Sequence, residues 1–181
     1  MTQTLTDRAL IEEASKKSAL IWVHGGDSGS AGAAGAGRAL WHVWHDGAVC
    51  LVGDGPGEQP LHGLDLVDGG AATVTVRSKD KGGRLVAWSA RVSELAPGGE
   101  AWTAAVEELK GKRLNAPDGD HIAERWAREC RVLRLEPAPV AVANLPTGSL
   151  AAPPLPTPAT TRRPMPAGLP KLLLRRRGRK R

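Results

Sequence analysis

The sequence contains no phenylalanine and no tyrosine, so six tryptophans are the whole aromatic content of its 181 residues. The core of one ordinary domain must therefore take its bulk from tryptophan and aliphatic side chains. Cysteine is also scarce. Cys50 and Cys130 each lie in an apolar, strand-like run, and no Cys-x-x-Cys or Cys/His ligand spacing is present. This pattern excludes a disulfide-rich scaffold and predicts two free, buried thiols in a cytoplasmic protein.

Long hydrophobic runs are missing as well. No stretch approaches the roughly 20 apolar residues that a membrane-spanning helix needs. The acidic residues Asp7, Glu12 and Glu13 interrupt the segment in which a signal peptide would carry its apolar core. We therefore expect neither a membrane span nor a secretory leader.

The net charge of +6 belongs to one end of the chain. Residues 162–181 hold nine Lys/Arg and no acid, while the rest has 16 Lys/Arg against 19 Asp/Glu, a net of −3. A domain-wide nucleic-acid surface is therefore not supported. Ten of the 14 prolines fall in residues 137–181, a composition that buries too little apolar surface to offset the entropy of ordering. We predict a domain over residues 1–137 and a disordered, Pro-rich and basic tail over residues 138–181.

The tail ends in Arg175–Arg177, Arg179, Lys180 and Arg181. Such a cluster could contact nucleic acid or an anionic surface. A solubilising tail without a partner is the favoured interpretation.

Alternating apolar and polar residues predict a mainly β fold. Residues 72–77 and 86–92 alternate with period two around Gly82-Gly83, as in an antiparallel hairpin with one buried face. Further strands are expected over residues 18–24, 38–44, 48–52 and 130–135, and helices over residues 4–17, 97–115 and 120–129. Six strands in an antiparallel meander fit a closed barrel, because closure removes exposed edges. One N-terminal helix and two helices before the last strand are then peripheral.

Several short motifs contain residue types that bind anions, metals or nucleotides. Cations gather at the turn of the central hairpin, where Arg77 and Lys79 could hold a phosphate, although a solvated turn is favoured. His42 and His45 face opposite sides of a strand and its turn, so no metal site is expected. The Gly-rich residues 25–37 lack a surrounding βαβ unit, which argues against a dinucleotide fingerprint.

Three segments carry a family resemblance: RALWHVWHDGAVCLVGDGPGEQPLHGL, ATVTVRSKDKGGRLVAWSARV and KRLNAP…ERWARECRVLRLEP. Through them, residues 18–136 resemble the pyridoxamine 5'-phosphate oxidase-like, FMN-binding split-barrel family, and more narrowly its small actinobacterial members. The resemblance implies a six-stranded antiparallel split β-barrel, a homodimer, and an FMN or deazaflavin F420 site at the dimer interface. The cofactor would then perform the redox chemistry on a small molecule.

The resemblance also assigns residues to that cofactor. Arg38 opens the strand that lines the phosphate and ribityl region in relatives. Gln59 stands where many relatives place a lysine. Because the usual cation is missing, either Arg38, Arg77 or Lys79 replaces it, or cofactor binding has been lost.

Two tryptophans and a glutamate lie near these residues in the sequence. Trp41 and Trp44 could stack on an isoalloxazine ring, although core filling is favoured for both. Glu58 is expected to be an exposed loop carboxylate rather than a general base. No catalytic residue is assigned.

Three functions remain open at this point. The first is an FMN- or F420-dependent oxidoreductase-like protein acting on a small molecule. The second is a split barrel that binds a cofactor or another ligand without catalysis. The third is an interaction protein that uses its basic tail.

Overall fold

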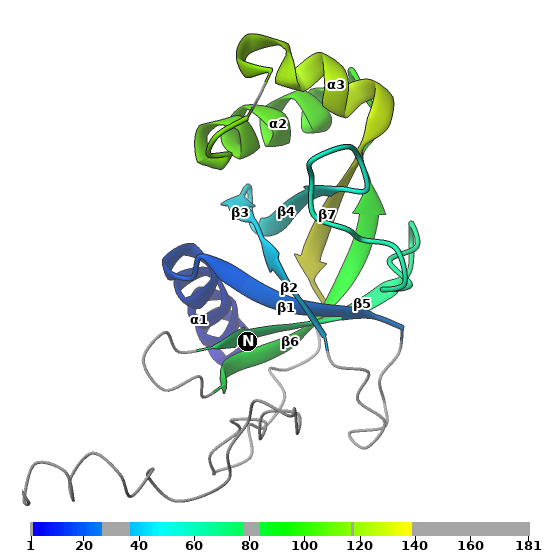
Figure 1. Ribbon diagram of the computed structural model, residues 1–181. Coiled ribbons are helices and arrows are strands. Elements are labelled where there is room, and N and C mark those ends of the chain that lie inside the picture. Colours follow the sequence, from blue (N-terminus) through cyan, green and yellow to red (C-terminus); the bar gives the residue numbers. More distant parts are fainter. Residues whose placement is uncertain (1, 27–36, 78–83, 117, 139–181) are drawn as a thin grey trace, which may run out of the picture. The chain divides into compact units, whose positions relative to one another are not determined.

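The computed structural model describes residues 2–26, 37–77, 84–116 and 118–138 of the chain (Figure 1). Lys79 and the predicted tail beyond residue 138 lie outside these ranges. The described part contains strands β1 (Leu20–Gly25), β2 (Arg38–Trp41), β3 (Val43–His45), β4 (Ala48–Gly53), β5 (Ala71–Arg77), β6 (Arg84–Glu94) and β7 (Arg131–Pro137). Its helices are α1 (Thr2–Lys17), α2 (Glu100–Lys112), the 3-10 turn η1 (Gly119–His121) and α3 (Ile122–Glu129).

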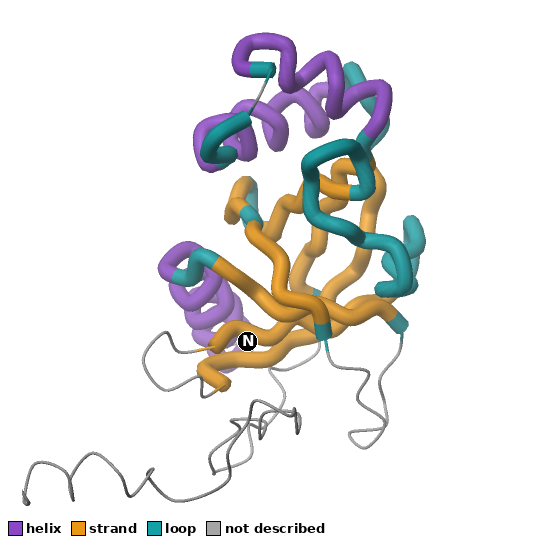
Figure 2. Tube along the Cα trace, viewed as in Figure 1, coloured by secondary structure: helices purple, strands orange, loops and turns teal. Residues whose placement is uncertain are grey.

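All seven strands form one antiparallel sheet in the order β2-β1-β5-β6-β7-β4-β3. Only His42 separates β2 from β3, so the two outermost strands are one continuous stretch that changes partner midway. This stretch curls the sheet into a barrel (Figures 1 and 2). The predicted mainly β, antiparallel class, with one N-terminal helix and two helices before the last strand, is confirmed. The six predicted strands correspond to these seven, because the strand predicted over residues 38–44 is interrupted at His42.

The predicted meander is wrong in its connectivity. β4 pairs with β7 rather than with the next strand, and β5 pairs with β1. The connection between β4 and β5 is a long loop that buries Leu61, Leu64 and Leu66 in the barrel core. In the sheet, β6 and β7 lie between β5 and β4, so this loop connects two strands that are not neighbours instead of making a hairpin turn.

Two hydrophobic clusters divide the core. The interior cluster holds residues such as Val49 and Leu51 together with Trp88. Cys50 and Val52 point to the other side of β4, where the second cluster packs under α2 and α3 and around the fully buried Trp126. β4 is buried on both faces, which explains why its sequence AVCLVG is apolar throughout.

Helix α1 contacts β3 and β6, and its Ile11 packs into the interior cluster. Together with the loop leucines, this side chain fills the barrel. Within the described ranges, no helix has the length and apolar character needed to cross a membrane.

Candidate functional site

The barrel is split where its closing stretch changes partner. Trp41 is the last residue of β2 and pairs with Leu20, whereas Val43 opens β3 and pairs with Cys50. On one side of the break, the Gln59 amide joins β2 to β4: it exchanges two 2.9 Å hydrogen bonds with the Trp41 backbone and donates to the Val52 carbonyl at 3.1 Å. On the other side, His42 reaches α1.

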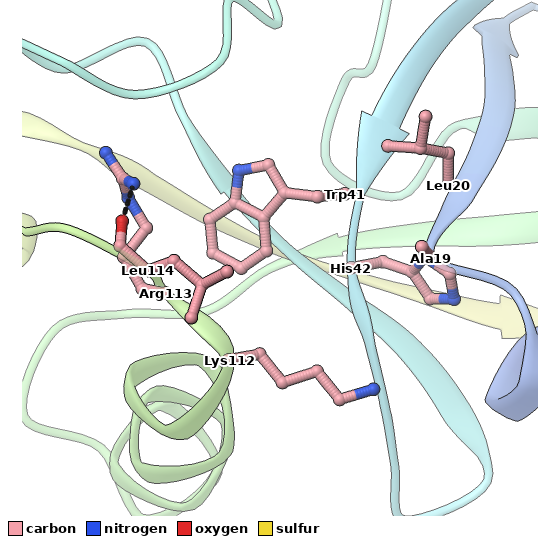
Figure 3. Close-up of a pocket in the computed structure, with 7 residues that line it drawn as sticks. All are labelled: Ala19, Leu20, Trp41, His42, Lys112, Arg113 and Leu114. Atoms are coloured by element: carbon pink, nitrogen blue, oxygen red, sulfur yellow. Dashed lines mark hydrogen bonds between the residues drawn. The ribbon is translucent and has the colours of Figure 1, made fainter.

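A cavity of about 390 Å³ opens beside this break. We call it the Trp41 pocket; its lining residues are Ala19, Leu20, Trp41, His42, Lys112, Arg113 and Leu114 (Figure 3). The walls come from the start of β1, the β2–β3 break and the end of α2. Leu20 and Leu114 are 43% and 75% exposed. A volume of this size, with apolar walls and few polar groups, is typical of small-molecule sites.

The pocket carries positive charge. Lys112 ends α2 and extends toward the β2–β3 stretch (Figure 3). Among the described residues it has no ion pair. Arg113 is held in place, because its Nη1 donates to the Leu114 carbonyl at 2.6 Å and its Nη2 to the Gly57 carbonyl at 2.8 Å. No carboxylate is among the lining residues that the structure describes, so the site favours an anion.

His42 is the buried polar group of the pocket. It is 3% exposed, and its Nε2 lies 2.9 Å from the Ser15 carbonyl, to which the ring donates. Burial lowers the pKa of His42 to about 4, and nearby Lys112 acts in the same direction. The ring is thus neutral near pH 7. Its Nδ1 is a buried acceptor with no partner among the described residues.

This burial predicts an acid-sensitive fold. Because the folded-state pKa lies below the ordinary value of 6.5, the unfolded chain binds the proton first, and stability is lost as the pH falls below about 6.5. Between pH 7 and pH 5 we expect His42 to account for a loss of about 2 kcal/mol in the free energy of unfolding. Urea unfolding at both pH values checks this. His42→Leu should show a correspondingly smaller difference; an unchanged difference would contradict the buried, neutral ring.

Glu58 corrects a prediction. It was expected to be an exposed loop carboxylate, but its side chain is 0% exposed. It pairs with Arg113 at 3.0 Å and with Arg125 at 3.0 Å, and it accepts a 3.0 Å hydrogen bond from Trp126 Nε1. Arg125 also pairs with Asp118 at 2.6 Å, and these carboxylates raise the pKa of its guanidinium. Glu58 is therefore neutralised by two arginines and does not repel an anion from this region.

Arg38 and Arg77, two further residues assigned to the cofactor that the structure describes, do not lie together. Arg38 lies opposite the core residue Val23 and donates from Nη1 to the carbonyls of Pro60 and His62, both at 2.9 Å. Arg77 follows the buried Val76 and stacks on the outward-facing Trp22, with its guanidinium carbon 4.5 Å from the ring centroid. Opposite faces of the sheet thus carry the two arginines, and one phosphate cannot bridge them within this chain.

Arg77 lines a different cavity, of about 430 Å³, with Leu10, Glu13, Ala14, Lys17, Ser18 and Leu85. Trp44 packs against the interior cluster, and the amide of Gln59 is engaged with backbone groups. Of the residues that were considered from sequence and that the structure describes, only Trp41 and His42 line the Trp41 pocket. Lys112, Arg113 and Leu114 were missed, because the predicted helix ran through them.

Both cysteines are unpaired, as predicted. Cys50 is buried, whereas Cys130 is only half-buried. Burial raises the pKa of each thiol to about 11, so neither is a reactive thiolate at neutral pH.

No protein-family model matches the chain, and no curated protein is detectably similar to it. A solved structure, that of HutZ, the heme storage protein from Vibrio cholerae, is similar at 14% sequence identity and a TM-score of 0.49, covering 71% of this chain and 87% of that chain. A likeness at this level does not identify a ligand.

Proposed function

We propose that this protein is a split barrel of the pyridoxamine 5'-phosphate oxidase type that binds a planar, anionic small molecule in the Trp41 pocket. The observation that carries the proposal is the composition of that pocket: apolar walls, one indole ring and the cation Lys112, which has no ion pair among the described residues. Flat apolar surface suits an aromatic ring, and a cation without an ion pair suits an anionic substituent.

The ligand class that fits best is FMN or F420. Lys112 would face the anionic group and Trp41 the ring. A phosphate dianion needs several donors, and Arg113 adds those of its guanidinium N–H groups that do not bond to protein. When bound, such a cofactor supplies the redox chemistry. The chain's own residues bind and orient it, and none is assigned a catalytic step.

A non-catalytic ligand-binding barrel remains the second candidate. It is favoured by the dispersal of Arg38 and Arg77, which leaves fewer cations for a phosphate than the resemblance implies. Turnover of reduced cofactor by the purified protein separates this candidate from an oxidoreductase.

A homodimer stays part of the proposal. The exposed leucines at the mouth of the pocket, Leu20 and Leu114, offer an apolar contact surface. Light scattering that returned the mass of a monomer at micromolar concentration would count against it.

The proposal is tested by titrating FMN and F420 into the protein while following tryptophan fluorescence. Lys112→Ala is expected to weaken binding about tenfold, equivalent to about 1.4 kcal/mol, because it removes a charge-assisted contact. Affinity should also fall as salt rises. Lys110→Ala is the matched control, since Lys110 lies on the same helix but pairs with Glu107 and does not line the pocket. Equal losses in both variants would point to long-range charge rather than to this site, and no binding of either cofactor would refute the proposed ligand class.

A further inference from the structure

The two walls of the Trp41 pocket come from parts of the chain that are far apart in sequence. Lys112 ends α2 and Arg113 and Leu114 follow it, whereas Trp41 and His42 lie at the β2–β3 break. β2 ends at Trp41, and the facing wall is the end of a helix, so the hydrogen bonds of the sheet do not connect the two walls. Apolar packing of Trp41 against the second hydrophobic cluster, to which α2 contributes Trp102 and Leu109, brings the two walls together. Polar contacts behind the pocket then hold each wall.

Glu58 holds the helical wall. Its buried carboxylate pairs with Arg113 Nε, and the same guanidinium donates to the carbonyl of Gly57, next to Glu58 in the chain. A guanidinium fixed at several N–H groups has little rotational freedom. Through its other contacts, to Arg125 and Trp126, the carboxylate also joins this wall to α3.

Gln59 holds the strand wall. Its Oε1 accepts from the Trp41 amide and its Nε2 donates to the Trp41 carbonyl. The Gln59 side chain thus binds both the N–H and the carbonyl of Trp41. It takes the place of a neighbouring strand, because β2 is at the edge of the sheet order. The third bond, to the Val52 carbonyl, ties Trp41 to the end of β4.

We propose that the adjacent residues Glu58 and Gln59 position the two walls of the Trp41 pocket from outside it, Glu58 through Arg113 and Gln59 through Trp41. Neither residue lines the pocket. They are positioning residues for a ligand, a role that rests on the proposed function, and they connect the pocket to the packing of α3 on the barrel. Because coupling is reciprocal, an anionic aromatic ligand that binds the pocket slows the opening of α3.

The inference is first tested without a ligand, by amide hydrogen exchange on the full chain. Glu58→Gln keeps the side chain's size and removes its charge, and should speed exchange at Arg113, whose amide donates to the Leu109 carbonyl, and at the amides of α3 by about tenfold or more. Gln59→Met removes the three hydrogen bonds and should speed exchange at Trp41. Glu107→Gln, on the exposed face of α2, is the control and should change none of these amides. Protection within β5 and β6 reports that each variant is folded.

FMN binding is then measured on the same proteins. If FMN binds the wild type, Glu58→Gln and Gln59→Met should each weaken it about tenfold while Glu107→Gln leaves it unchanged, and bound FMN should slow exchange in α3. Unchanged exchange at Arg113 and Trp41 in folded variants overturns the inference, whatever FMN does. Wild-type affinity in both variants also overturns it while leaving the proposed function intact. If FMN fails to bind the wild type, the proposed ligand is refuted, and the exchange result alone decides whether the pair positions the walls.

Discussion

Glu58→Ala is expected to lower the free energy of unfolding by about 3–5 kcal/mol, the usual cost of removing one partner from a buried ion pair. The side chain is 0% exposed and neutralises two arginines that are themselves 21% and 13% exposed. Without it, Arg113 loses its carboxylate, and the indole N–H of the buried Trp126 loses its acceptor. Urea unfolding monitored by tryptophan fluorescence measures the loss.

Glu107→Ala is the control for this prediction. Glu107 is 66% exposed and pairs with Lys110 on the same helix, an interaction that contributes little in water. Its removal should change stability by no more than about 0.5 kcal/mol. If the two variants were equally stable, Glu58 would be solvated and the buried network would not exist.

Gly53→Ala is expected to cost about 3 kcal/mol, because overpacking a filled site forces backbone to move. Gly53 ends β4 and is buried. A Cβ placed there would collide with the backbone carbonyl of Gln59 and would lie 2.6 Å from Leu61 Cγ. The substitution therefore displaces the loop that carries Glu58 and Gln59. It should weaken ligand binding in the Trp41 pocket as well as lower the stability of the fold.

Gly111→Ala provides the opposite expectation. Gly111 lies within α2, and a Cβ at this position meets no atom within 4 Å. Alanine should therefore stabilise the helix by about 0.5–1 kcal/mol. Thermal unfolding of the two variants side by side is the measurement. A Gly53→Ala protein as stable as the wild type would mean that the loop does not pack against β4 as described.

Much of the fold is predictable from local pattern. The alternation over residues 72–77 and 86–92 identifies β5 and β6, since side chains of a strand alternate between the two faces. The stretch over residues 38–44 is also identified, although its change of partner at His42 is not. Pairing of β4 with β7 could not be predicted, because it depends on a loop whose leucines enter the core from a distance along the chain.

The site is less predictable, for a physical reason. Glu58 and Gln59 were noticed because of the family resemblance, but nothing near them in sequence indicates burial. The partners of Glu58 lie 55 and 67 residues away, on elements that meet it only after folding. Lys112 and Leu114 were not predicted to be pocket residues, because the helix was expected to continue to residue 115. In the structure α2 ends at Lys112, and the residues that follow it form a wall of the pocket.

The central claim, that the Trp41 pocket is the ligand site, is tested most directly by the indole N–H signals of the six tryptophans in a nitrogen–proton correlation spectrum during titration with FMN. We expect the Trp41 signal to shift most, while that of Trp88, which is buried in the interior cluster, moves least. Trp22 is the informative comparison, because it stacks with Arg77, which lines the other cavity. A shift confined to Trp22, with Trp41 unmoved, would place the ligand near the cavity that Arg77 lines and would contradict the account.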